Sequence, residues 1–165
     1  MNELSANKIE LAKGMLEDIK SLEIQLRTKK LEYSKYCFEN GVLDLTHLKP
    51  DDLISIACET FNLTNKQLTN AGRKFEICQP RQVLMYYLHR IFNDLRVTES
   101  GNKQDGFLSL KEIGNIFDNK DHSTIIHSIR KVESCIQQPE WNPFLYGFYT
   151  KLKDAIFSKI GVDIK

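Results

Sequence analysis

The sequence predicts an all-α protein, and three observations lead to that prediction. Apolar residues recur three and four positions apart in several separate segments, which places them on one face of a helix. Proline, glycine and helix-capping residues stand between those segments. No segment alternates apolar and polar residues over the length of a strand. With 165 residues, 41% hydrophobic and 27% charged, the chain has the size and composition of a small globular domain with an appendage.

Residues 1–40 are expected to form one long amphipathic helix that ends near Gly41. Its apolar residues keep a spacing of three and four and are Ile9, Ala12, Leu16, Ile19, Leu26 and Tyr33. Glu23 and Lys30 interrupt the series. The helix therefore either packs on its own domain or forms a short coiled coil with a second copy or another protein, and the pattern favours neither.

Residues 41–50 form a linker, after which Asp51 or Asp52 is expected to cap a helix that runs to about Phe61. Residues 62–70 contain a short helical turn. This part of the chain therefore supplies two helical elements before the first basic loop.

The basic loop contains Arg73 and Lys74 and precedes a strongly patterned helix. Pro80 is expected in the first turn of that helix, where its missing amide proton is not needed. The polar, glycine-containing residues 96–108 predict a mobile loop after the helix.

Residues 109–131 predict two helices joined by a short turn. Ser109 and Glu112 have the spacing of a capping box at the start of the first helix. Asn119 lies in the turn and can adopt a left-handed conformation, and Asp121 is the expected N-cap of the second helix. Exposed donors and acceptors at the start of the second helix are what a helix-turn-helix presents to the major groove of DNA.

Pro139 and Pro143 interrupt the chain before a final amphipathic helix, from Phe144 to about Ile160. The predicted organisation has four parts: a helical arm (1–40), a linker (41–50), a helix-turn-helix domain (51–138) and a C-terminal segment whose helix packs on that domain (139–165).

Composition and motifs argue against several classes of protein. The net charge of +1 means that any nucleic-acid role must depend on local placement of basic residues. The four cysteines are widely spaced, so free thiols in a reducing cytoplasm are expected, and no apolar run reaches the roughly 20 residues of a membrane span. His122 and His127 are five residues apart, which separates them by about 140° around a helix and suits no shared metal. With no nucleotide-binding or hydrolase motif either, the prediction is a protein without catalysis, cofactor or metal.

Local placement of polar residues favours DNA binding instead. His122 can donate or accept a hydrogen bond at a base edge, and the methyl group of Thr124 can contact a thymine methyl. Lys120 and Lys131 suit phosphate oxygens. The candidate DNA-contacting residues are Arg73, Lys74, Arg81, Gln82, Lys111, Lys120, Asp121, His122, Ser123, Thr124, His127 and Lys131.

Several of these positions have a plainer interpretation. Asp121 can be a helix cap alone, and His127 can be a partly buried packing residue. Arg81 can pair with a surface carboxylate, and Arg73 with Lys74 can belong to an ordinary surface loop.

Two motifs carry a family resemblance. They are P-R-Q at residues 80–82 and I-G-x-x-F-x-x-K-D-H-S-T-I-x-H-x-x-x-K at residues 113–131. Upstream, residues 54–68 read I-x-x-A-C-x-x-F-N-L-T-x-x-Q-L. On these motifs, residues 52–133 resemble the C-terminal duplex-DNA-binding domain of the bacterial replication initiator DnaA.

The resemblance implies a helix-turn-helix module that binds a short asymmetric box in double-stranded DNA. It implies that Arg73 enters the minor groove and that Arg81 and Gln82 lie against the DNA. Residues 121–124 would then contact the major groove and the adjacent backbone, and Lys131 matches a basic position late in the recognition helix.

The sequence also departs from the family pattern. The basic loop keeps only Arg73 and Lys74 and is followed by Glu76. Lys120 stands where the family usually has arginine, which removes bidentate geometry. Residues 96–108 resemble an insertion, and no ATPase module precedes the domain in this sequence, where the helical arm stands instead.

The predicted function is sequence-specific binding of double-stranded DNA by a stand-alone DnaA-like protein. It would act in replication initiation or control, or in transcriptional regulation, in the bacterial cytoplasm at the nucleoid or as a phage- or plasmid-encoded protein. The alternative is a helical protein-interaction module that kept the fold and lost DNA binding.

Overall fold

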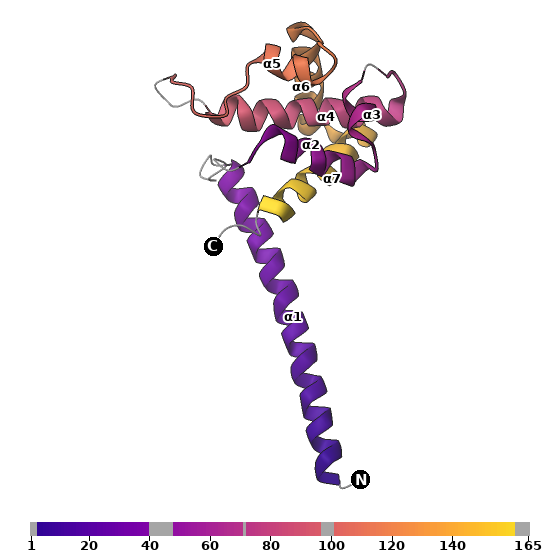
Figure 1. Cartoon of the computed structure of the whole chain (residues 1–165). Helices are drawn as coiled ribbons and strands as arrows, with labels where there is room; N and C mark the ends of the chain where they lie inside the picture. The colour runs from indigo at the N-terminus through magenta and orange to yellow at the C-terminus, as the bar shows by residue number, and fades with distance from the viewer. Residues whose placement is uncertain (1–2, 40–47, 71, 97–100, 161–165) are drawn as a thin grey trace. The chain divides into compact units, whose positions relative to one another are not determined.

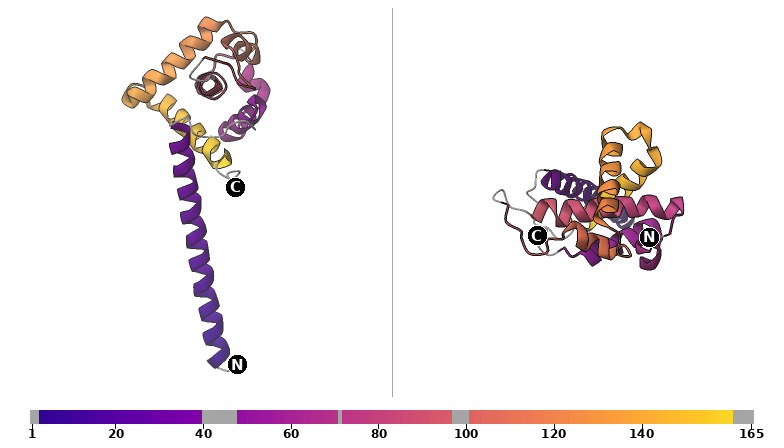
Figure 2. Two further views of the ribbon diagram at one scale, coloured as in Figure 1. Left: turned by 90° about the vertical axis from the view of Figure 1, so that its left-hand side faces the viewer. Right: turned by 90° about the horizontal axis from the view of Figure 1, so that it is seen from above.

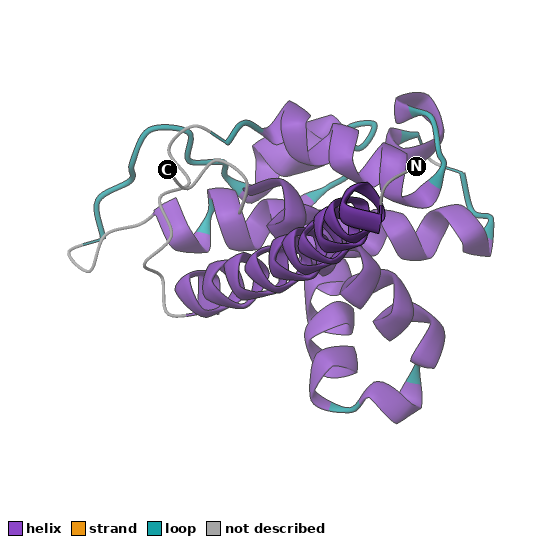
Figure 3. Cartoon of the chain, turned by 90° about the horizontal axis from the view of Figure 1, so that it is seen from below, coloured by secondary structure: helices purple, strands orange, loops and turns teal. Residues whose placement is uncertain are grey.

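The computed structural model describes residues 3–39, 48–70, 72–96 and 101–160, and every element within them is a helix (Figures 1 and 3). In chain order these are α1 (Glu3–Glu39), α2 (Pro50–Phe61), α3 (Asn65–Thr69), α4 (Phe75–Phe92), the 3-10 helix η1 (Asp94–Arg96), α5 (Leu110–Ile116), α6 (His122–Gln137), the 3-10 helix η2 (Pro139–Trp141) and α7 (Pro143–Ile160). The all-α prediction is confirmed.

The chain divides into two compact units, one of residues 1–42 with 157–165 and one of residues 43–156. In the first unit α1 is a single helix of 37 residues, as the sequence pattern predicted. Among the side chains of α1 that the structure describes, the large apolar ones are exposed by half or more, including Leu16 (52%) and Leu26 (57%).

Helix α4 is the centre of the second unit, because α2, α3, α5 and α6 all contact it. The right-hand view of Figure 2 shows α6 crossing α4. Val83, Leu84, Leu88 and Ile91 of α4 are fully buried in the resulting core. Burying aliphatic side chains of this size stabilises the fold by about 1.5–3 kcal/mol each. Helix α4 therefore anchors the elements on either side of it in the sequence.

Helix α4 begins at Phe75, five residues before Pro80, so the prediction that Pro80 opens the helix was wrong. A proline inside a helix removes one bond to the carbonyl four residues earlier, and that carbonyl here belongs to Glu76, an exposed residue in the first turn. The ring of Phe75 meets that of Phe144 edge to face, with centroids 5.9 Å apart. Because Phe75 and Phe144 are far apart in the sequence, no local pattern around Phe75 indicates this contact with α7.

Helix α2 also begins earlier than predicted. Its N-cap is Lys49 and Pro50 occupies the first turn, so neither Asp51 nor Asp52 is the cap. The Asp52 carboxylate still serves this terminus, because its Oδ2 accepts the backbone amide of Lys49 at 2.9 Å.

Aromatic side chains pack α7 on the domain. Phe148 meets Phe61 of α2 edge to face at 5.5 Å between centroids. Tyr149 stacks on Tyr87 of α4, with centroids 5.6 Å apart and ring planes 4° from parallel. The C-terminal helix thus covers α2 and α4 through large rings, each pair of which adds about 0.5–1.5 kcal/mol to burial.

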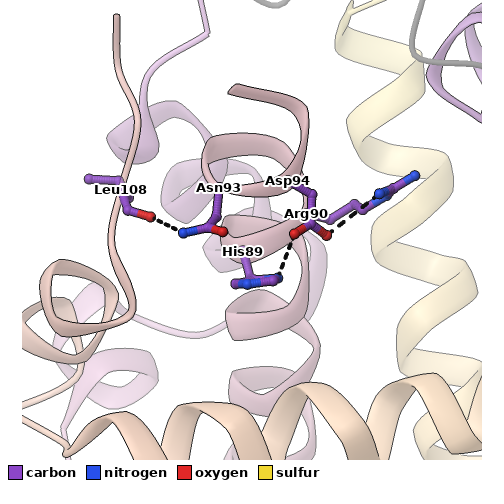
Figure 4. A network of polar contacts seen from close by, with 5 residues as sticks. All are labelled: His89, Arg90, Asn93, Asp94 and Leu108. Carbon is purple, nitrogen blue, oxygen red and sulfur yellow. Dashed lines mark hydrogen bonds and ion pairs between the residues drawn. The ribbon is translucent and has the colours of Figure 1, made fainter. Parts of the chain in front are cut away.

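The loop after α4 is anchored where the structure describes it. Asn93 donates its side-chain amide to the carbonyl of Leu108 at 2.7 Å (Figure 4). Arg96 Nη1 donates to the carbonyl of Asp105 at 2.8 Å. The prediction of a mobile loop did not anticipate these anchors, and its residues 97–100 lie outside the described part of the chain.

Candidate nucleic-acid interface

The turn between α5 and α6 depends on a close approach at Gly114. Its carbonyl oxygen accepts the amides of Phe117 at 3.0 Å and Lys120 at 3.1 Å. A Cβ atom at position 114 would collide with the carbonyl oxygen of Lys120. Glycine therefore lets the end of the turn lie directly on α5.

Two left-handed residues reverse the chain within this turn. Asn119 has a φ of 53°, as predicted, and Asp118 has a φ of 59°. Asparagine and aspartate tolerate this conformation better than other non-glycine residues. The turn is thus short and fixed by both its own backbone and Gly114.

Asp121 caps α6, as predicted. Its Oδ1 accepts the backbone amide of Thr124 at 2.8 Å and the hydroxyl of Ser123 at 2.6 Å. The hydrogen bond from Ser123 and then that from Thr124 lower the pKa of the Asp121 carboxyl from 3.8 to about 2. The carboxylate therefore stays ionised at neutral pH, and the Ser123 hydroxyl proton is committed to it.

The capping box at the start of α5 is confirmed. The Ser109 amide donates to Glu112 Oε2 at 2.8 Å, and the Glu112 amide donates to Ser109 Oγ at 3.3 Å. The side-chain and backbone hydrogen bonds from Ser109 lower the pKa of the Glu112 carboxyl. Both helices of the pair thus begin at well-defined positions.

Helix α6 divides into a buried and an exposed face. Ile125 and Val132 are fully buried against the domain. His122, Ser123 and His127 are exposed, whereas Thr124 and Lys131 are partly buried. The interpretation of His127 as a packing residue was therefore wrong. The predicted base-reading residues lie together at the accessible N-terminal end of α6, with Lys131 farther along.

Arg81 is not placed to contact DNA. Its side chain is 4% exposed, and it donates from Nε to Leu68 O at 2.7 Å, from Nη1 to Gly72 O at 2.7 Å and from Nη2 to Gln67 O at 3.1 Å. Burial lowers the pKa of the guanidinium, although arginine stays charged at neutral pH. Arg81 was interpreted above as a DNA contact or as a surface ion pair, and both interpretations were wrong. It is an internal support for the backbone of α3 and of Gly72.

Gln82 lies in the second turn of α4 and is partly buried, not in an exposed first turn as expected. Its Oε1 is buried, and none of the described residues donates to it. Arg73 and Lys74, by contrast, are exposed directly before α4, where Lys74 is the N-cap residue. The structure thus separates the exposed basic loop from Arg81, which is buried, and from Gln82, which is partly buried.

The two remaining predicted cations lie in α5 and in the turn between α5 and α6. Lys111 is exposed in the first turn of α5, and Lys120 is partly buried in the turn before Asp121. Lysine side chains in a helix-turn-helix suit contacts to a phosphate backbone, and Lys120 directly precedes the N-cap of α6.

Sequence reasoning missed two residues beside this surface. Arg130 is exposed three positions after His127, and Trp141 of η2 is 75% exposed. Together with Lys131 and Asn142 they line a cleft of about 380 Å³. The helical spacing of His127, Arg130 and Lys131 was a signal for Arg130, but nothing local linked Trp141 to α6.

Within the described part of the chain, no cluster of three or more histidine, cysteine, aspartate or glutamate side chains suits a metal ion. None of the described helices is long and apolar enough to cross a membrane.

Comparison with known proteins identifies similarity over this same region. The family described as "Bacterial dnaA protein helix-turn-helix" matches residues 50–132, which run from the start of α2 into α6. The chromosomal replication initiator protein DnaA of Thermomicrobium roseum is 31% identical over 93 residues, covering 56% of this chain and 17% of that protein. DnaA of Thermus thermophilus is 32% identical over 84 residues, covering 51% and 16%. DnaA of Lachnoclostridium phytofermentans is 28% identical over 143 residues, covering 78% and 28%. The chain spans less than a third of the length of these curated relatives.

Proposed function

This chain belongs to the bacterial DnaA helix-turn-helix family, and from that premise we propose that it binds double-stranded DNA sequence-specifically through the N-terminal half of α6. The observation that carries the proposal is the exposed start of α6, capped by Asp121 and fixed against α5 at Gly114. A helix-turn-helix places the first residues of its second helix at base edges in the major groove.

The hydrogen bonds of the Asp121 cap determine which donors and acceptors the first residues of α6 can present to a base. Ser123 donates its proton to Asp121, so its oxygen is left to accept, which suits an amino group of adenine or cytosine. The imidazole of His122 takes no part in the two cap hydrogen bonds described above and can donate to the acceptors of guanine or adenine. Thr124 keeps its methyl group for a thymine methyl. Recognition thus depends on His122, Ser123 and Thr124 in a fixed orientation.

Phosphate contacts would come from cations around the start of α6. Lys111 lies in the first turn of α5, Lys120 lies in the turn before α6, and Lys131 follows on α6 itself. The net charge of +1 gives little long-range attraction to DNA. Affinity therefore depends on these local contacts together with base recognition.

Arg73 would enter the minor groove from the loop before α4. Arg81 supports this assignment indirectly, because its Nη1 holds the carbonyl of Gly72, the residue before Arg73. An arginine on a short, anchored loop loses less conformational freedom on binding than one on a free loop.

The biological setting that fits such a reader is replication initiation or its control, or transcriptional regulation. It would act in the bacterial cytoplasm at the nucleoid, or as a phage- or plasmid-encoded protein in a bacterial host. The DnaA relatives named above carry replication initiation in their names, which favours the first of these roles.

Self-association through α1 would bring a second helix-turn-helix domain into the same complex. Ile9, Leu16, Ile19 and Leu26 follow one another at helical spacing and are each 50–57% exposed. A long amphipathic helix gains most of its stability from covering its apolar face. A second copy can cover that face with the same residues, because a two-fold interface is self-complementary.

Sedimentation velocity tests the α1 proposal. The double variant Ile19→Lys, Leu26→Lys is expected to be monomeric at a concentration where the unaltered chain is dimeric. Glu17→Lys adds the same side chain on the opposite face of α1 and should leave the dimer intact. A monomeric unaltered chain at high micromolar concentration would refute self-association.

Fluorescence anisotropy with labelled duplexes tests the DNA-binding proposal. The full chain is titrated with a DnaA-type box and with a scrambled box, at two salt concentrations. Tighter binding to the box, by the factor of 10³ or more typical of specific sites, is expected. Equal and weak binding to both duplexes would contradict sequence-specific binding and favour the protein-interaction alternative.

A further inference from the structure

A cleft of about 380 Å³ lies between the second half of α6 and η2. His127, Arg130 and Lys131 reach it from α6, and Trp141 and Asn142 reach it from η2 and the residue after it. Part of this cleft is built from residues beyond position 132, where the family match ends. The side of the cleft formed by Trp141 and Asn142 is therefore a feature of this chain that the proposed reading of a DNA box does not use.

Trp141 is an exposed ring on an anchored backbone. Its amide donates to the carbonyl of Gln138 at 3.2 Å. The Cys135 thiol of α6 donates to the carbonyl of Asn142 at 3.3 Å, and Asn142 Oδ1 accepts the amide of Leu145 in α7 at 3.1 Å. The ring is nevertheless 75% exposed. The short segment between α6 and α7 thus holds a large aromatic surface toward solvent.

The charged side chains that line the cleft are all basic. Arg130 and Lys131 contribute cations, and His127 contributes a titratable ring. Of the described residues that line the cleft, none carries a carboxylate. A phosphate would therefore meet attraction without an opposing charge in the lining, and arginine can bind two phosphate oxygens at once.

We propose that this cleft binds an unpaired nucleotide of a DNA strand, with its base stacked on Trp141 and its phosphate held by Arg130 and Lys131. An exposed aromatic ring beside clustered cations is the combination that single-strand binding sites use, because every base has a face that stacks on a ring. A base inside a duplex already stacks on its neighbours and must leave them before it can cover the indole. The cleft therefore selects an unpaired strand over an intact duplex.

Binding of an unpaired nucleotide in the cleft is separate from recognition of a duplex box. Trp141 and Arg130 have no role in the proposed contacts of His122, Ser123 and Thr124 with a box. Lys131 is shared by both proposals, so it is left unaltered in the experiment below.

Trp141 is the one tryptophan in the sequence, so intrinsic fluorescence of the full chain reports on this cleft. Titration with a short oligothymidine strand is expected to quench the fluorescence to a saturable limit. An equal concentration of the same strand in a duplex, or of free thymidine monophosphate, should quench it far less. A quench of the same size by the duplex, or by the free nucleotide, would overturn the assignment to an unpaired strand.

Variants then separate stacking from phosphate binding, with a dye on the oligothymidine as the readout. Trp141→Ala should weaken binding by about 5- to 150-fold, the range for loss of one base stack, and Trp141→Phe should retain most of the affinity. Arg130→Ala should weaken binding by about tenfold, comparable to losing one charge-assisted contact. Lys151→Ala removes an exposed cation from α7 outside the cleft and should change little.

Two results would overturn the proposal. One is an absence of quenching by the single strand. The other is an unchanged affinity of both Trp141→Ala and Arg130→Ala, with folding of each checked by circular dichroism. If Trp141→Ala fails to fold, the quenching of the unaltered chain and the affinity of Arg130→Ala decide the question.

Discussion

Nη1 of Arg81 lies 2.7 Å from the carbonyl oxygen of Gly72, the residue directly before Arg73. The P-R-Q motif associates Arg81 with DNA, but its side chain points inward and holds the backbone of Gly72. The next residue, Arg73, is exposed. The two arginines have separable roles: Arg81 supports the fold and Arg73 is available to a ligand.

Replacing Arg81 is therefore expected to affect stability first. Arg81→Ala would leave the carbonyls of Gln67, Leu68 and Gly72 without this donor, and hydrogen bonds from charged groups are strong. We expect the free energy of unfolding to fall by about 3 kcal/mol. Urea denaturation measures this change. Arg73→Ala is the matched control, expected to weaken DNA binding while leaving the denaturation midpoint unchanged.

Gly114 offers a second test of the turn. Gly114→Ala forces a methyl group against the Lys120 carbonyl and should lower the free energy of unfolding by about 1–3 kcal/mol. Gly147→Ala is the control, because a Cβ at this exposed position in α7 meets nothing within 4 Å. Alanine is the better helix former, so Gly147→Ala should stabilise by up to about 1 kcal/mol. Equal thermal melting temperatures for the two variants would contradict the close approach.

These tests also mark what the sequence alone could predict. The caps of α5 and α6 were predicted correctly because each joins residues three positions apart, such as Asp121 and Thr124. The reversal at Asn119 was predicted for the same reason, since turn chemistry is local. Local signals thus sufficed to locate the helix pair and the exposed start of α6.

Three features that the sequence did not reveal depend on partners farther away in the chain. Arg81 finds its acceptors 9 to 14 residues earlier, and no pattern in P-R-Q indicates that direction. The start of α4 at Phe75 is packed against Phe144 of α7. Trp141 joins Arg130 in one cleft only because the segment after α6 folds back beside that helix. Each case needed tertiary structure to resolve.

The Asp121 cap of α6 should make the free energy of unfolding depend on pH under acidic conditions. Asp121 has a folded pKa of about 2 against an ordinary value of 3.8, so the folded state binds this proton less readily than the unfolded state does. Its contribution is fully present above the unfolded pKa and is lost as the pH falls from about 5 to about 2. Asp121→Asn keeps an acceptor but removes the titration.

Urea midpoints of the unaltered chain and of Asp121→Asn, measured across that range, isolate this effect from other acids such as Glu112. We expect the difference between the two proteins to shrink as the pH falls. A constant difference from neutral pH to pH 2 would show that ionisation of Asp121 does not stabilise the helix.

Base contacts and phosphate contacts at α6 should respond differently to mutation. His122→Ala is expected to reduce the discrimination between a box and its scrambled sequence by about 1–3 kcal/mol, the value of one good base contact. Lys131→Ala should weaken both complexes alike and make the slope of log K against log salt shallower by about 0.9. The three proposed phosphate partners, Lys111, Lys120 and Lys131, give a slope near −2.7 for the unaltered chain. Anisotropy titrations at several salt concentrations yield both quantities. Should His122→Ala keep the full preference for the box, base reading has to be assigned to Ser123 and Thr124 instead.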